Sequence, residues 1–207
     1  MKISYFVSII GAFALDYFKT SSLNFNGIFS AFKISTLLTL WWIFYFKYGW
    51  KIWGLRKILY KVNLIGTWYG SYESYDAKKE NLSKGDIVLR INQDYLNISI
   101  ISFTKKYINY SYSEELKYEE KSDTHGIIYV YSQRENAPFD LEARNGTSDL
   151  RVIKNKNIYR LEGDFWTILG SKGKIKVTRV SKHRVDSFAD GKKLYNKMRI
   201  GMLGEEK

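Results

Sequence analysis

The sequence predicts an all-β domain, an eight-stranded up-and-down antiparallel barrel, preceded by a hairpin of two transmembrane helices. Within the first 62 residues, two long apolar runs are separated by only a few polar residues, a pattern typical of membrane helices. From residue 65 onward, apolar and polar residues alternate with a period of two, and turn-forming segments interrupt the alternation. This second pattern is typical of consecutive β-strands.

The two apolar runs cover residues 3–18 and 28–46, and each contains one charged residue, Asp16 and Lys33 respectively. At 1.5 Å per residue the second run is about 28 Å long, close to the hydrocarbon thickness of a bilayer. The first run, about 24 Å long, is short but sufficient if its flanking residues help. A cleaved signal peptide is the alternative for the first run.

The distribution of charge predicts how the hairpin lies in the membrane. Lys19 is the only cation between the runs. Five cations follow the second run: Lys47, Lys51, Arg56, Lys57 and Lys61. The positive-inside rule therefore places the rest of the chain in the cytoplasm. Residues 50–62 are expected to form a basic amphipathic helix on the anionic leaflet. The predicted domains are thus 1–62, the hairpin with its junction, and 63–207, a cytoplasmic barrel.

Polar residues within the spans predict an interface between transmembrane helices. These residues are Asp16, Lys33, Thr36 and Thr39. Such side chains are costly in lipid unless they meet polar partners, so we expect the helices to associate through them. The alternative for Lys33 is that its long side chain reaches outward to the interface.

The barrel is predicted from eight short segments that alternate or are rich in β-branched and aromatic residues. They cover residues 65–75, 86–93, 95–103, 107–114, 126–134, 149–154, 158–168 and 174–181. The turn-forming breaks include 83–85, 145–146 and 170–173. Eight strands joined by short turns favour a closed barrel, which can enclose one small ligand. Residues 185–198 are expected to form a short helix outside it.

The alternation also predicts which side chains share a face. Trp68 and Tyr72 lie on one side of the first strand, and Ile175, Val177 and Arg179 lie on one side of the last. If these faces form the interior, Arg179 is a charge inside the barrel. It must then meet an aromatic face, a carboxylate or an anionic ligand.

The composition argues against catalysis. The chain has 207 residues, a net charge of +12, no cysteine and two histidines. Without cysteine there is no disulfide, thiolate metal site or cysteine nucleophile. No Walker loop, dinucleotide fingerprint, HExxH or GxSxG motif is present. We therefore expect no enzyme activity, catalytic residue, metal or cofactor. Since much of the excess positive charge lies in the apolar N-terminal segment, a lipid bilayer is a better expected partner than DNA or RNA.

Two resemblances suggest what the barrel does. Gly66 and Trp68, with Arg179 in the last strand, resemble the Gly-x-Trp motif and partner arginine that close one end of lipocalin-type barrels. This resemblance implies a barrel-closing role for Gly66 and Trp68.

The layout of nearly the whole chain resembles the SMODS-associating 2TM, β-strand-rich effectors of CBASS antiphage systems, the family of CD-NTase-associated protein 15. The resemblance rests on the hairpin, the basic aromatic junction, GTWYG at 66–70, the barrel and YRLEGDFWT at 159–167. It implies that the barrel binds a cyclic dinucleotide or oligonucleotide made by a partner nucleotidyltransferase. Binding would drive homo-oligomerisation of the helices, disruption of the bacterial inner membrane and abortive infection.

A cyclic dinucleotide carries two phosphates and two bases, so its site needs cations and aromatic faces. The candidate ligand-binding residues are Tyr72, Arg90, Tyr110, Tyr112, Tyr129, Tyr131, Arg151, Arg160 and Arg179. Arg90 is the weakest candidate because it points away from the face of Ile87 and Leu89. Ordinary strand packing is the alternative for each tyrosine.

Two other functions stay open. A membrane-anchored barrel could bind a lipid or another small apolar ligand, as the lipocalin resemblance alone would suggest, or the protein could be a structural inner-membrane protein with no ligand. A polar lumen that bears cations favours a nucleotide, whereas a purely apolar lumen favours a lipid.

Overall fold

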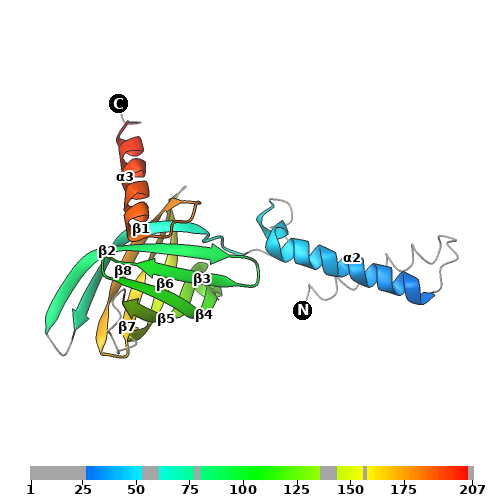
Figure 1. Cartoon of the computed structure of the whole chain (residues 1–207), viewed down its shortest axis with the longest axis horizontal. Coiled ribbons are helices and arrows are strands. Elements are labelled where there is room, and N and C mark those ends of the chain that lie inside the picture. Colours follow the sequence, from blue (N-terminus) through cyan, green and yellow to red (C-terminus); the bar gives the residue numbers. More distant parts are fainter. Residues whose placement is uncertain (1–26, 53–60, 77–79, 136–143, 156–157, 205–207) are drawn as a thin grey trace. The chain divides into compact units, whose positions relative to one another are not determined.

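The computed structural model describes residues 27–52, 61–76, 80–135, 144–155 and 158–204. The chain divides into two compact units, Met1–Tyr45 and Phe46–Lys207. The second unit contains a closed barrel followed by a helix (Figure 1).

The barrel has eight antiparallel strands that pair in chain order, and β1 pairs with β8 to close it. The strands are β1 (Gly66–Asp76), β2 (Asn81–Gln93), β3 (Ile98–Phe103), β4 (Tyr107–Glu119), β5 (Thr124–Glu135), β6 (Arg144–Asn155), β7 (Ile158–Thr167) and β8 (Ser171–Ser181). The predicted eight-stranded up-and-down barrel is confirmed. Closure gives every strand a neighbouring strand on both sides.

Two predicted turns are wrong, because residues 83–85 lie within β2 and residues 145–146 lie within β6. The third, predicted at 170–173, lies earlier, at 168–170, because β8 already begins at Ser171. A side chain at Gly85 would come within 2.9 Å of the Tyr72 ring, and one at Gly146 would come within 2.5 Å of the Tyr131 hydroxyl. Each glycine therefore makes room for a tyrosine from the neighbouring strand. Glycine inside a strand often marks such a close approach.

The third strand begins later than predicted, at Ile98 instead of residue 95. The Asp94 carboxylate accepts backbone N–H hydrogen bonds from Leu96 at 2.8 Å and from Asn97 at 2.6 Å. These bonds hold the residues after β2 in a turn, because an aspartate side chain can replace the strand partner of a nearby backbone group.

The core fills one end of the barrel, where the predicted inward faces meet. Trp68 and Leu89 are fully buried, and Val177 is 1 % exposed. The cluster around them also contains Leu64, Ile91, Ile100, Ile127, Leu150 and Leu161. The large side chains leave no continuous lumen at this end, which we call the closed end.

The first turns of helix α3 (Phe188–Gly204) pack on the outer face of the barrel next to β1 (Figure 1), and the helix confirms the predicted C-terminal helix. The rings of Tyr69 and Tyr195 stack with their centroids 4.4 Å apart. Gly191 lies so close to Val88 that a side chain there would come within 2.5 Å of it. The outward apolar residues of β1 and β2 are thus covered by the helix, forming a second, smaller core with Phe103 and Val185.

The N-terminal region contains helix α2 (Gly27–Lys47), which coincides with the second predicted apolar run. Over the residues that the structure describes, no helix is both long and apolar enough to cross a membrane. The first predicted run, with Asp16, lies outside the described residues, as do residues 53–60 of the predicted junction. A short 3-10 helix, η1 (Gly49–Lys51), follows α2.

Candidate ligand-binding site

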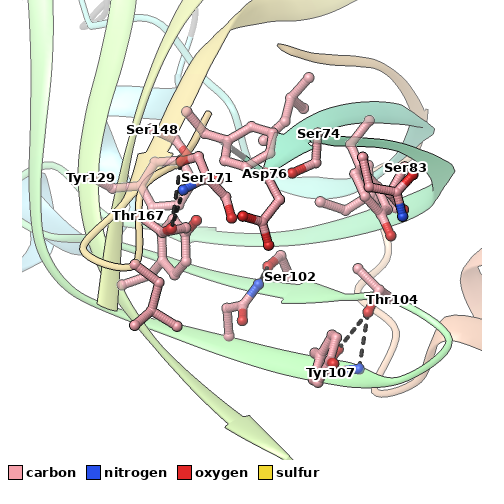
Figure 2. A pocket seen from close by; sticks show the side chains of 18 residues that line it. Ser74, Asp76, Ser83, Ser102, Thr104, Tyr107, Tyr129, Ser148, Thr167 and Ser171 are labelled. Carbon is pink, nitrogen blue, oxygen red and sulfur yellow. Dashed lines mark hydrogen bonds between the residues drawn. The ribbon is translucent and has the colours of Figure 1, made fainter. Parts of the chain in front are cut away.

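A cavity of about 490 Å³ lies inside the barrel, at the end where β1 finishes and β2 begins (Figure 2). We call this the cavity end. Side chains from all eight strands line it: Tyr72, Ser74, Asp76, Asn81, Ser83, Ile87, Ser102, Thr104, Tyr107, Asn109, Tyr129, Tyr131, Ser148, Phe165, Thr167, Leu169, Ser171 and Ile175. Its volume falls within the range of about 300–1,000 Å³ that is usual for small-molecule sites.

The same alternation that builds the core also builds the cavity. Along β1 the inward positions change from Trp68 at the closed end to Tyr72, Ser74 and finally Asp76 at the cavity end. The interior is therefore apolar and filled at one end, and polar and hollow at the other.

Two tyrosines of β5 form an aromatic wall. The ring centroids of Tyr129 and Tyr131 are 5.9 Å apart, and both side chains are buried. Burial raises the pKa of Tyr129 to about 12 and also raises the pKa of Tyr131. The Ser148 hydroxyl beside Tyr129 opposes part of this rise in pKa. Both phenols are therefore neutral hydrogen-bond donors at physiological pH.

Two polar atoms of the lining are buried without a hydrogen-bond partner. They are the hydroxyl oxygen of Ser148 and the carboxamide oxygen Oδ1 of Asn109. The amide nitrogen of Asn109 donates to the Ser102 hydroxyl at 2.8 Å. Buried polar atoms are almost always satisfied in folded proteins, so two exceptions in one cavity require an explanation.

The described lining of the cavity contains one charged side chain, Asp76, and no lysine or arginine. Figure 2 shows the Asp76 carboxylate pointing into the cavity. Among the described residues, no group of His, Asp and Glu side chains could hold a metal ion. The described lining therefore offers hydroxyl, amide and carboxylate groups that can pair with both donors and acceptors of a ligand.

The predicted arginines do not line this cavity. Arg90 faces outward, forms an ion pair with Asp186 and lies 6.0 Å from the ring of Phe103. Arg151 is exposed on β6, and Arg160 is half-buried on β7. The sequence correctly indicated that Arg90 points away from the interior.

Arg179 points inward, but at the closed end. Its guanidinium carbon lies 5.0 Å from the ring centroid of Tyr159 and 5.8 Å from that of Trp68. Its Nη1 donates to the backbone carbonyl of Asn63 at 2.8 Å. Burial lowers the pKa of Arg179, an effect that Tyr159 opposes.

Gly66 and Trp68 meet Arg179 at this end. The indole nitrogen of Trp68 donates to the carbonyl of Leu64 at 2.9 Å. Gly66 has a φ of 132°, and a side chain there would collide with the carbonyl of Ser181. Only glycine fits this backbone conformation and this close approach. The structure thus brings the three residues of the lipocalin resemblance together.

Among the predicted tyrosines, Tyr72, Tyr129 and Tyr131 line the cavity. Tyr110 and Tyr112 are 41 % and 61 % exposed and do not line it. A role in ligand binding stays a prediction for all of them. Four further lining residues were not predicted from the sequence: Ser102, Asn109, Ser148 and Phe165. The alternation of inward and outward residues could have placed these side chains inside the barrel. A serine or asparagine in a strand, however, does not by itself indicate a ligand-binding role.

A second recess, of about 500 Å³, lies at the closed end and has a basic lining. Its cationic residues are Lys51, Lys182 and Arg184, next to His183. Arg184 donates to the side-chain oxygen of Asn92 at 2.6 Å. Cations therefore gather at the end of the barrel opposite the aromatic cavity.

Comparison with curated proteins finds no match for the sequence. The family described as Cap15, cyclic dinucleotide receptor domain, matches residues 61–179. The match covers more than half of the chain and extends from the residues before β1 into β8. It confirms the resemblance to the CBASS effectors, and it describes a receptor rather than a catalytic domain. The chain therefore belongs to the Cap15 cyclic dinucleotide receptor family.

Proposed function

We propose that the cavity inside the barrel is where the protein binds a cyclic dinucleotide, and that binding activates it as an effector of CBASS antiphage defence. Membership of a cyclic dinucleotide receptor family gives the ligand class. The observation that supports the location is the hollow end of the barrel, about 490 Å³ in volume, with aromatic and hydrogen-bonding walls that lie within the matched segment.

The lining suits a nucleotide better than a lipid. Tyr72, Tyr129 and Phe165 offer aromatic faces on which bases can stack. Hydroxyl and amide groups surround them, among them Ser74, Ser83, Ser102, Thr104, Asn109 and Ser148. An acyl chain would leave these polar groups without hydrogen bonds, which is costly in a buried site.

For the output of the sensor, we propose that ligand binding drives association of the N-terminal helices and disrupts the bacterial inner membrane. Support comes from the apolar runs at 3–18 and 28–46, and from the cations that follow the second run. On α2, the large apolar side chains Leu37, Leu40, Trp41, Ile43 and Phe44 are exposed. Such a surface needs a lipid or protein partner. The ligand can shift the association only by its differential affinity for the two states.

Thermal unfolding of the full chain in detergent tests the ligand class. The purified protein is heated with each member of a panel of 3′,3′-cyclic dinucleotides and, separately, with fatty acids. We expect at least one cyclic dinucleotide to raise the melting temperature in a concentration-dependent manner, because a ligand that binds the folded state stabilises it. A response to fatty acids alone would support the lipid-binding alternative instead.

Leakage of dye from anionic vesicles tests the proposed output. The double variant Lys33→Leu with Thr36→Leu removes two polar groups from the second predicted span. It should keep ligand binding but lose ligand-dependent leakage, because polar contacts drive helix association in lipid. A matched control, Lys105→Leu with Lys106→Leu, changes two exposed residues of the β3–β4 turn and should leak as the wild type does. Undiminished leakage from the Lys33 and Thr36 variant would show that these residues do not form the working interface.

A further inference from the structure

We infer that the cavity receives the nucleobases of the ligand and not its phosphates, and that Ser148 and Asn109 hydrogen-bond to base edges. The inference rests on the proposed function, a cyclic dinucleotide in the barrel. It follows from the two orphaned polar atoms, the charge of the lining and the position of the aromatic rings.

Ser148 is fully buried in the middle of β6, and its hydroxyl has no hydrogen-bond partner. In the sheet it lies opposite Tyr129 on β5 and Phe165 on β7, so two rings flank it. An orphaned hydroxyl between aromatic side chains is unfavourable in the empty protein. A planar ligand group that stacks on either ring would carry its polar edge to this hydroxyl.

Asn109 further limits which ligand group can bind, because its amide nitrogen already donates a hydrogen bond to Ser102. The group left without a partner is the carbonyl oxygen Oδ1, which can only accept a hydrogen bond. The ligand must therefore bring a donor to it. A phosphodiester has no donor at neutral pH, whereas every nucleobase carries amino or imino N–H groups and the ribose carries a hydroxyl. The aromatic rings of the lining favour the base of these two groups.

The charge of the described lining also favours a base over a phosphate in the cavity. Asp76 is the only charged side chain among the described residues of the lining. The described lining thus offers no cation to pair with a phosphate. The base portion is thus the part of the ligand that complements the cavity.

Calorimetric titration of the full chain in detergent tests this inference. The probes are 3′,3′-cyclic di-AMP, cyclic di-GMP, cyclic UMP–AMP and cyclic di-UMP, which share one phosphate ring and differ in their bases. Ser148→Ala and Asn109→Ala should each weaken the preferred probe about tenfold, as expected for the loss of one buried hydrogen bond. They should also reduce the discrimination among bases. Ser99→Ala, an exposed serine of β3, serves as the matched control and should bind as the wild type does.

Two further measurements separate base contacts from other roles. The slope of log affinity against log salt reports phosphate neutralisation, so it should be the same in the wild type and both variants. In the absence of ligand, Ser148→Ala should have an unchanged or higher melting temperature, because the substitution removes an unsatisfied buried group. A structural hydroxyl would instead make the alanine variant less stable.

The outcomes are distinct. If no probe binds the wild type, the proposed function fails and the inference fails with it. If a probe binds the wild type and the two variants bind it within twofold, the proposed function stands and the inference is wrong. A changed salt slope in the variants would likewise overturn the inference, because it would place these residues near the phosphates.

Discussion

Replacing Arg179 by alanine should destabilise the barrel without weakening ligand binding. The guanidinium group contacts the faces of Trp68 and Tyr159 and donates to the carbonyl of Asn63. A cation–π contact is worth roughly 0.5–1 kcal/mol at an exposed site and more when it is desolvated. A hydrogen bond from a charged group contributes roughly 1.5–3 kcal/mol. Because Arg179 is only half-buried, we expect a total loss of about 2–3 kcal/mol.

Urea unfolding of the full chain, followed by tryptophan fluorescence, measures this loss. The melting temperature should fall as well, by about 2–4 °C for each kcal/mol. Arg179→Lys keeps the charge but not the planar fork, so its loss should be intermediate. Arg151→Ala removes an exposed arginine and should change the stability by less than about 0.5 kcal/mol. An unchanged melting temperature together with lost ligand binding would refute the reasoning and make Arg179 a ligand contact.

Three further predictions concern other parts of the barrel. Gly146→Val would drive the Tyr131 ring into the cavity, since a side chain there comes within 2.5 Å of the hydroxyl; titration of the preferred cyclic dinucleotide should show affinity reduced more than about tenfold. Burial raises the pKa of Tyr129 to about 12, above the ordinary value near 10. The contribution of the neutral phenol to folding stability is therefore complete below pH 10 and is lost as the pH rises towards 12. Tyr129→Phe should make that decline shallower in urea unfolding measured from pH 9 to 12. Gly191→Val should loosen α3 by colliding with Val88, and limited proteolysis should then release the C-terminal helix faster than in the wild type.

The period-two pattern was sufficient to predict the number of strands, their order and their inward faces. Counting forward by two from Ile175 and Val177 correctly placed Arg179 on the inward face of β8. The pattern could not separate a turn glycine from a packing glycine. Gly85 and Gly146 were predicted to lie in turns because the tyrosine ring that packs against each glycine comes from another strand. Only the register between strands brings those rings and glycines together.

The site was harder to predict, because alternation gives the face of a residue but not its depth along the barrel. Arg179 and Tyr72 both point inward, yet one closes the barrel and the other lines the cavity. The expectation that phosphates require cations selected arginines on several strands, whereas the described lining of the cavity contains no lysine or arginine. Ser148 looks like any strand serine in the sequence. Its significance lies in a missing partner, which is a property of the packed structure alone.

The separation of the cationic recess from the cavity affects how such a receptor discriminates between ligands. The basic recess of Lys51, Lys182 and Arg184 lies at the closed end, and the buried side chains around Trp68 fill the barrel between it and the cavity. One small ligand cannot reach both. Cyclic dinucleotides share their phosphate ring and differ in their bases, so strong phosphate contacts would favour all of them equally and add no selectivity. A lumen that complements the bases makes its buried contacts with the part of the ligand that differs between cyclic dinucleotides. Because these contacts do not depend on phosphate charge, the selectivity should persist at high salt.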